Sequence, residues 1–225
     1  MHRQFEHELE EIKLGILSMA GLVEKCLDDI ATALTNQDSE LAEAVIAMDE
    51  EIDHREVEID RLATEFIARH QPTATDLRFV IVAIKLGPEL ERIADNAVNI
   101  AERVLHMSKY PLVKPLIDLP RMLGLAHAMV SDSIAAYVAR DAKAARQIIR
   151  RDDEVDSLYM QIFRELLTYM IEDPKTISRA IDLILVARFI ERIADQATNI
   201  AEEVVYLVEA RPIRHVWPVP EIEES

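Results

Sequence analysis

The sequence has few of the residues that interrupt helices, with only four glycines and nine prolines among 225 residues. That scarcity is typical of long helices joined by few turns. There is a single cysteine, Cys26, so an internal disulfide is excluded and an oxidising compartment is not required. The sequence contains neither a glycine-rich phosphate-binding loop nor a Gly-x-Ser-x-Gly nucleophile motif, so it indicates neither of those catalytic classes.

Positive charge and long apolar runs are also scarce. Lysine and arginine number 25 against 42 acidic residues, and the net charge is −17. Phosphate backbones repel such a surface, so nucleic acid is not expected as a direct partner. The longest apolar runs, such as FVIVAI at residues 79–84, are far shorter than the roughly 20 residues of a membrane helix. The first residues, MHRQFEHELEE, lack the apolar core of a signal peptide. We therefore expect a cytoplasmic protein that does not itself span a membrane.

What the sequence does contain is helical periodicity. Half of its residues are hydrophobic, and over residues 86–104 they recur at alternating steps of four and three. Residues 186–204 repeat that pattern. This is the seam of a helix that packs against other helices. Segments rich in proline and capping residues divide the chain, the strongest being 108–120 with three prolines. The pattern predicts helices over residues 4–35, 39–70, 75–107, 119–139, 142–171 and 176–209.

The chain is also an internal repeat. ERIADNAVNIAERV at residues 91–104 returns as ERIADQATNIAEEV at residues 191–204, with eleven of fourteen letters identical. Earlier in each copy the offset is 103, so that Asp38 corresponds to Asp141. Repeated units indicate repeated architecture. The sequence therefore predicts an all-α fold of two pseudo-symmetric three-helix bundles in tandem. The first would span residues 1–110, and the second, with a C-terminal tail, residues 111–225.

Acidic side chains mark the second and third predicted helix of each unit. They form pairs four residues apart, on a side of the third helix away from its apolar seam. The pairs are Asp49 and Asp53, Glu91 and Asp95, Asp152 and Asp156, and Glu191 and Asp195. Asn99, Glu102, Asn199 and Glu202 continue the stripes by one turn. Such pairs repel each other unless a cation lies between them.

Carboxylates are hard oxygen ligands, and two helices can present four of them to one ion. The stripes contain no histidine or cysteine, which disfavours the usual kind of zinc site. Magnesium, manganese, calcium or iron remain. A solvated acidic face on a metal-free helical scaffold is the alternative. A carboxylate-bridged metalloenzyme is a further alternative, because Glu51 and His54 match the Glu-x-x-His of di-iron bundles. The second unit has Ser157 in place of that histidine, and the acids are expected to point outward, so we expect no enzyme.

These segments together resemble the PhoU family over essentially the whole chain. The resemblance is strongest in NQDSELAEAVIAMDEEID, RHQPTATDLRFV, ELERIADNAVNIAE, LLTYMIEDPKTI and FIERIADQATNIAEE. It implies two three-helix bundles whose Glu/Asp-x-x-x-Asp motifs bind metal, with iron, manganese and magnesium as candidates. The motifs that match are the four acidic pairs. The family often has glycine where this chain has Ala94 and Ala194, and histidine or arginine where it has Asn96 and Gln196.

The resemblance also implies a function. Members of this family are negative regulators of phosphate uptake and of phosphate-starvation signalling. They are thought to connect the ATPase of a phosphate ABC transporter with a sensor histidine kinase, and they often form homodimers. The sequence is therefore expected to encode a non-enzymatic, metal-binding regulator of phosphate homeostasis.

Overall fold

The chain folds into long helices, as its periodicity predicts. The computed structural model describes residues 2–213, so the expected C-terminal tail, residues 214–225, lies outside the described residues. The helices are α1 (His2–Asn36), α2 (Ser39–His70), α3 (Ala74–Met107), α4 (Asp118–Ala139), α5 (Ala142–Glu172) and α6 (Ile177–Glu209), with a short 3-10 turn η1 (Pro174–Thr176) before α6. Each helix boundary lies within two residues of its predicted place. The all-α prediction is confirmed over the described range.

The start of the second helix in each unit is fixed by the same residue type. Asp38 accepts a hydrogen bond from the backbone N–H of Leu41 at 3.1 Å. Asp141, its counterpart 103 residues later, accepts from Lys143 and Ala144 at 2.9 Å. Both are N-caps, which satisfy backbone donors that have no partner inside the helix. The two capping aspartates therefore place α2 and α5 at equivalent points of the repeat.

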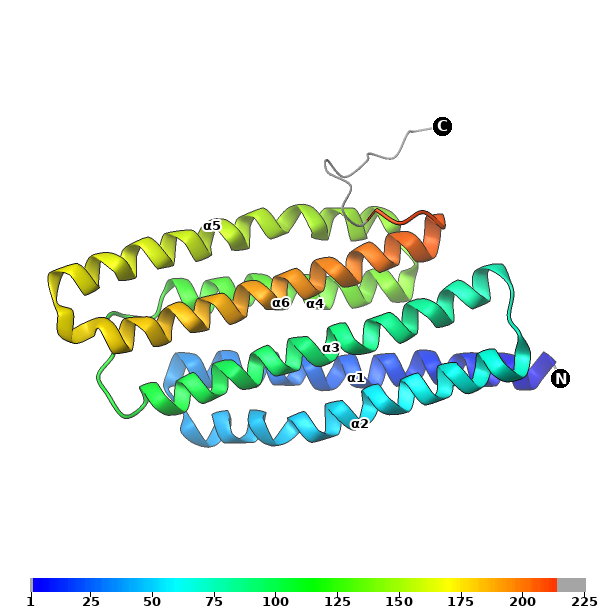
Figure 1. The fold of residues 1–225 in the computed structure, drawn as a ribbon, viewed down its shortest axis with the longest axis horizontal. Coiled ribbons are helices and arrows are strands. Elements are labelled where there is room, and N and C mark those ends of the chain that lie inside the picture. The colour runs from blue at the N-terminus through cyan, green and yellow to red at the C-terminus, as the bar shows by residue number, and fades with distance from the viewer. Residues whose placement is uncertain (1, 214–225) are drawn as a thin grey trace.

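The six helices form two bundles that share one core (Figure 1). Helices α1, α2 and α3 pack against one another, and so do α4, α5 and α6. The bundles meet where α3 lies beside α6 and α1 beside α4, and their buried apolar residues form one continuous cluster. The connection between the bundles, residues 108–117, contains the expected domain boundary at residue 110. The pseudo-symmetric arrangement places Glu91 on α3 and Glu191 on α6, the third helix of each bundle.

The seam between α3 and α6 is not purely apolar. Glu203 on α6 is buried and accepts from the Lys85 ammonium at 2.8 and 3.0 Å. Asp182, only 4% exposed, pairs with His106 at 2.8 Å and with Arg103 at 3.5 Å. Buried carboxylates that keep such partners avoid most of the cost of desolvation. These pairs therefore help to set the register in which the two bundles meet.

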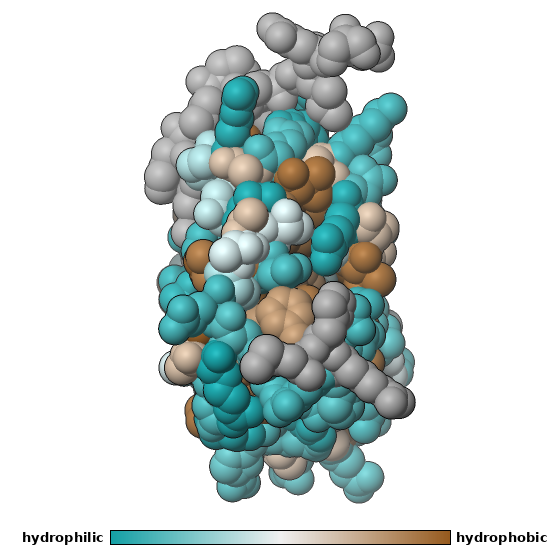
Figure 2. Space-filling view, turned by 90° about the vertical axis from the view of Figure 1, so that its right-hand side faces the viewer, coloured by the Kyte–Doolittle hydropathy of each residue, from teal (hydrophilic) through white to brown (hydrophobic). Residues whose placement is uncertain are grey.

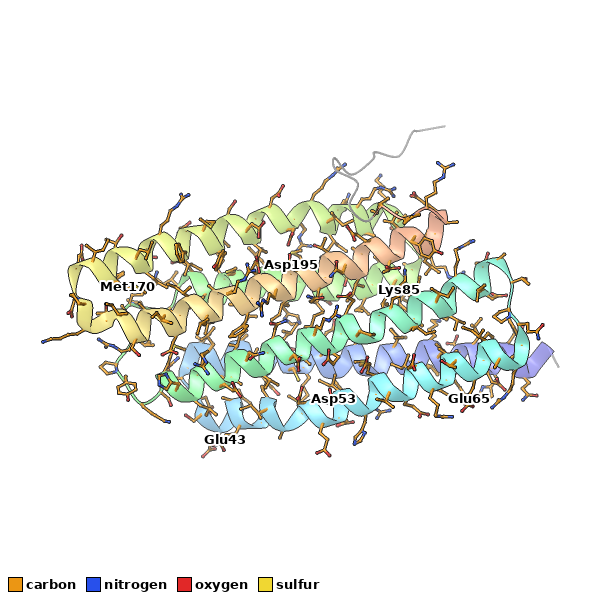
Figure 3. The ribbon with its side chains drawn as sticks, in the orientation of Figure 1. Glu43, Asp53, Glu65, Lys85, Met170 and Asp195 are labelled. Atoms are coloured by element: carbon orange, nitrogen blue, oxygen red, sulfur yellow. The ribbon has the colours of Figure 1, made fainter. Side chains whose placement is uncertain are left out.

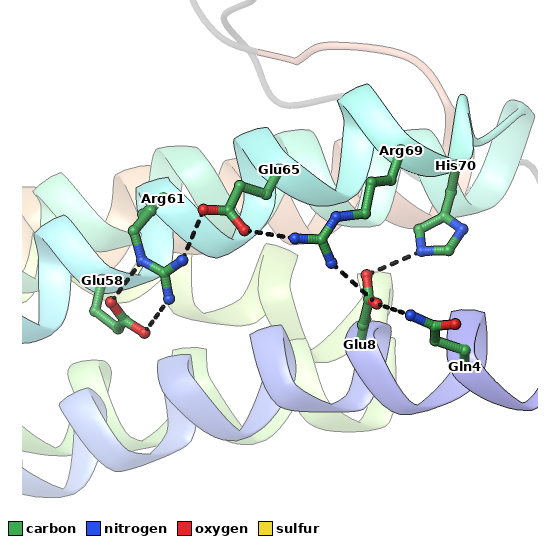
Figure 4. Close-up of polar contacts among 7 residues, drawn as sticks. All are labelled: Gln4, Glu8, Glu58, Arg61, Glu65, Arg69 and His70. Atoms are coloured by element: carbon green, nitrogen blue, oxygen red, sulfur yellow. Dashed lines mark hydrogen bonds and ion pairs between the residues drawn. The ribbon is translucent and has the colours of Figure 1, made fainter.

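Polar contacts also join α1 to α2 at the end of the molecule where the chain begins (Figure 4). The Glu8 carboxylate lies 2.9 Å from the His70 ring and accepts from Arg69 at 3.2 Å and from Gln4 at 3.0 Å. The hydrogen bonds to His70 and Gln4 lower the pKa of Glu8 below its usual range. Arg69 in turn donates to Glu65 one turn earlier on α2, at 2.9 Å. The network holds the first turns of α1 against the last turns of α2.

Helix α4 is the most apolar of the helices described. By length and composition alone, Asp118–Ala139 would suffice to cross a membrane. Half of its apolar window is buried inside the molecule, where α4 packs against α5, α6 and α1. A core helix satisfies the same test of length and composition, so the position of α4 accounts for its apolar character.

Candidate functional site

The acidic pairs lie on two pairs of packed helices, α2 with α3 and α5 with α6. Apolar seams bring these helices together: Val45, Ile52 and Ile59 of α2 are buried, as are Leu90 and Ile93 of α3. The carboxylates lie beside those seams. We call Asp49, Asp53, Glu91 and Asp95 the first acidic cluster, and Asp152, Asp156, Glu191 and Asp195 the second acidic cluster. Figure 3 shows Asp53 and Asp195 near the middle of the long axis, in different bundles.

In the first acidic cluster, carboxylates on α2 and α3 repel one another. Burial raises the pKa of Asp49, and the charges of Asp53 and Asp95 raise it further. Burial and Asp53 raise the pKa of Asp95 as well. For Glu91, burial followed by repulsion from Asp95, Glu56 and Asp53 raises the pKa to about 7. Because Asp53 is on α2 and Asp95 on α3, the repulsion acts across the gap between the helices.

Carboxylates on α5 and α6 repel one another in the same way in the second acidic cluster. Burial raises the pKa of Asp152 to about 7, with further contributions from Asp195, Asp156 and Glu191. Burial and then repulsion from Asp156 raise the pKa of Asp195. The pKa of Glu191 is raised by burial and by Asp195. The structure therefore places acids of α2 and α3, and acids of α5 and α6, within electrostatic range of one another, which the spacing along single helices left open.

Three carboxylate oxygens in these clusters are buried without a hydrogen-bond partner. They are Oδ1 of Asp49, Oδ1 of Asp152 and Oε2 of Glu191. Asp49 and Asp152 are counterparts in the repeat, so the same atom is left without a partner in both bundles. Buried polar atoms in folded proteins nearly always have a partner. Within residues 2–213, however, no three or more His, Cys, Asp or Glu side chains are arranged as a ready-made metal site.

One expectation about these acids is wrong. They were expected to point outward, away from the core, yet Glu191 is buried with only 9% of its surface exposed, and Asp49 and Asp152 are half-buried. The reason is that α5 packs closely on α6, and α2 on α3, so that a carboxylate beside one seam is covered by the neighbouring helix. Asp53, Asp95 and Asp156 are exposed, as expected.

Charged neighbours of both clusters were missed by the sequence argument. Glu56 adds a fifth negative charge beside Glu91. It can approach α3 because Gly87 lies opposite; a Cβ there would lie 3.3 Å from Glu56 Cγ. In the second acidic cluster, Arg188 donates to Glu191, and with Arg192 it opposes the rise of the Glu191 pKa. Asp153 adds a fifth acid beside Asp152 in that cluster, and in the first acidic cluster Arg92 opposes the rise of the Glu91 pKa.

The four residues that continue the stripes behave differently from one another. The Asn99 amide donates to the backbone oxygen of Asp95 at 2.7 Å. The Asn199 amide donates to Glu89 on α3 at 3.1 Å, so Asn199 contacts the seam between the bundles. Glu102 is exposed, and Glu202 is half-buried. A role for Asn99, Glu102, Asn199 or Glu202 in extending the clusters stays a prediction.

The raised pKa values predict that the metal-free protein loses stability as the pH rises from about 4 to about 7. In the folded protein the pKa of Glu91 and that of Asp152 are each about 7, against ordinary values of 4.5 and 3.8. Between these values the unfolded chain has lost its protons while the folded protein keeps them, so proton binding favours folding; this advantage is gone once the pH exceeds 7. Urea denaturation in chelator at pH 5 and pH 8 measures the effect. The double variant Glu91→Gln, Asp152→Asn should show a smaller difference, and an equal difference would contradict the shifted pKa values.

The fold defines a class: a repeat of two three-helix bundles that share one continuous core. Comparison with known proteins places the chain within that class. A family model described as the PhoU domain matches residues 16–104 and again residues 119–204. The chain belongs to the PhoU family, and the two matched ranges follow the two halves of the repeat.

Relatives support this assignment over nearly the whole length. A phosphate-specific transport system accessory protein PhoU homolog of Aquifex aeolicus is 44% identical over 208 residues, which are 92% of this chain and 94% of that protein. The phosphate-specific transport system accessory protein PhoU of Escherichia coli is 40% identical over 213 residues, 95% of this chain and 88% of that one. The crystal structure of PhoU from Pseudomonas aeruginosa matches with a TM-score of 0.89 and 38% identity, covering 92% of this chain and all of that one.

Proposed function

We propose that this protein is a negative regulator of phosphate uptake and of phosphate-starvation signalling. The observation that carries the proposal is the similarity to relatives named as accessory proteins of phosphate-specific transport, about 40% identical over more than nine tenths of the chain. Both repeats take part in the match, so the similarity is not that of one shared module. A relative that aligns over most of its length is expected to serve the same kind of transport system.

In this proposal the protein acts in the cytoplasm, as a scaffold rather than an enzyme. It contacts the ATPase of a phosphate ABC transporter and a sensor histidine kinase, and through them it reports the state of transport. It meets the membrane only through these partners, and it acts as a homodimer. The continuous core across both bundles supports a scaffold role. A single rigid body holds the surfaces that bind its two partners at a fixed distance and orientation.

Metal binding by the two acidic clusters is part of the proposal. The donor atoms fit: both clusters consist of carboxylates, and each contains at least one buried oxygen without a partner. In the first acidic cluster, cations would be held by Asp49, Asp53, Glu91 and Asp95. In the second acidic cluster, they would be held by Asp152, Asp156, Glu191 and Asp195. Hard oxygen ligands suit iron, manganese or magnesium. When bound, the cation would supply positive charge that offsets repulsion between the helices.

A carboxylate-bridged metalloenzyme is the rival function that a specific observation favours. Glu91 and Asp152 each have a pKa of about 7, the range in which acids serve as general acids or bases. Burial and repulsion within the clusters account for both values, so they do not require a catalytic role. Turnover of a phosphate ester by metal-loaded protein, lost with Glu91→Gln or Asp152→Asn, would favour the enzyme instead.

Co-purification tests the partners. Tagged protein expressed at its natural level is isolated from cells grown in phosphate-rich medium, and the bound proteins are identified. We expect the ATPase of the phosphate transporter and one sensor histidine kinase to be recovered, and neither to be recovered with the tag alone. Recovery of the ATPase without any kinase would contradict the proposed link while leaving the transport role intact.

A further inference from the structure

A groove of about 290 Å³ lies where the two bundles meet, away from the acidic clusters. It lies between the first turns of α1, the start of α3 and the end of α4. Its lining residues are Glu6, Leu9, Glu10, Lys13, Phe79, Tyr137, Val138 and Arg140. Figure 2 views the end of the molecule at which these segments lie, where hydrophilic side chains surround a few apolar ones. The groove is therefore small, with aromatic walls and a charged rim.

Tyr137 is the residue that makes this groove unusual. Its side chain is 2% exposed, and its ring stacks on Phe79 with 5.8 Å between centroids. Its hydroxyl is buried and has no hydrogen-bond partner. Burial raises the pKa of Tyr137, so the hydroxyl is neutral and able to donate. A buried donor without a partner costs stability, and a phenylalanine here would avoid that cost.

Arg140 is close enough to this hydroxyl to act on it electrostatically. Its positive charge opposes the rise of the Tyr137 pKa, and its guanidinium lies 5.7 Å from the centroid of the Phe79 ring. Arg140 is exposed and forms no ion pair with an acid among residues 4–213. It also has φ 52°, ψ 45°, the left-handed conformation that favours glycine or asparagine after a helix. An arginine and a tyrosine whose hydroxyl has no partner thus both line the groove.

The repeat provides an internal comparison. At the other end of the molecule, Leu112, Val113 and Arg179 stand at positions that correspond to three groove residues under the repeat offsets of 103 and 100. The space that they line is only about 10 Å³. Leu34, buried and apolar, stands where the second bundle has Tyr137. The same architecture therefore closes this space at one end, whereas at the other it leaves a groove that contains a hydroxyl without a partner.

We propose that this groove binds a small monocarboxylate with an apolar body. The Arg140 guanidinium would hold the carboxylate through two parallel hydrogen bonds, and the Tyr137 hydroxyl would donate a third. Leu9 and Phe79 would cover the apolar body. Lys13 on the rim already pairs with Glu10 at 3.4 Å, which leaves Arg140 to hold an anion, so a ligand with one negative charge fits better than a phosphate ester. Because helices of both bundles line the groove, the ligand would bridge them.

Titration calorimetry with 3-phenylpropionate and its uncharged amide tests the proposal on the full chain. We expect saturable binding of the acid, and at least about tenfold weaker binding of the amide, since a hydrogen bond to a charged group has that value. Tyr137→Phe and Arg140→Gln should each weaken binding of the acid by about tenfold or more. Glutamine occupies the equivalent left-handed position at Gln37, so the second variant keeps a side chain that this turn accepts.

Two controls separate recognition from damage to the fold. Tyr137→Phe should melt at the same or a higher temperature without ligand, because it removes a buried hydroxyl that has no partner. Arg121→Gln removes the same charge from an exposed site at the other end of α4 and should bind the acid as the parent does. Absence of saturable binding, equal affinity for acid and amide, or equal loss with Arg121→Gln would each overturn the proposal.

Discussion

A strain that lacks this protein should express its phosphate-starvation genes in phosphate-rich medium, at close to the level of starved cells. The expectation follows from the proposed role: without the scaffold, the sensor histidine kinase no longer receives the signal that transport is sufficient. The chain resembles the named accessory proteins of phosphate transport over both repeats. A transcriptional reporter for the starvation response, read in high and low phosphate, measures the effect.

The design needs two comparisons. Restoring the parent chain from a plasmid should return the reporter to its repressed level in high phosphate. Deleting the transporter ATPase alone should also derepress the reporter, because the signal arises from transport. Normal repression of the reporter in the strain without this protein would contradict a negative regulatory role, whatever its effect on growth.

The helices could be predicted because the signals that define them are local. Apolar residues at steps of three and four mark each helix, and an aspartate cap or a proline marks most boundaries. Packing across the seam between the bundles could not be predicted in the same way. Glu89 and Asn96 of α3 are buried there, beside α6. The period of a single helix shows which face is apolar, but it does not show which polar residues a second bundle will cover.

The candidate site shows the same limit. Spacing along single helices identified the acidic pairs, but whether two helices bring them together is a property of packing. Glu56 was missed although it lies three residues after Asp53, on the same stripe. The repeat concealed it, because the offset of 103 places Tyr159 at the equivalent position of the second unit. Two features could have identified Glu56: the acidic stripe continues by one turn to reach it, and Gly87 lies opposite.

The double variant Asp49→Asn, Asp152→Asn should lose most of any metal-dependent rise in melting temperature. Asparagine keeps the shape of the side chain and removes one charge from each cluster, at the two equivalent carboxylates that have a buried oxygen without a partner. A cation that binds only the folded protein stabilises it by about 2.7 kcal/mol at a concentration one hundred times its Kd. For the parent we therefore expect melting to shift upward with Mn²⁺, Fe²⁺ or Mg²⁺, and the metal content of the purified double variant should be lower.

Without metal, we expect the opposite order of stability for the parent and the double variant. Asp49 repels Asp53 and Asp95, and Asp152 repels Asp195 and Asp156, so the double variant should be at least as stable as the parent in chelator. This reversal distinguishes a binding site from a structural one, because loss of a merely structural contact would lower stability in both conditions. Glu43→Gln with Glu172→Gln removes the same charge from exposed positions outside the clusters and should respond to metal as the parent does. Equal metal content and equal metal response in parent and double variant would mean that the repeated acids are a solvated surface.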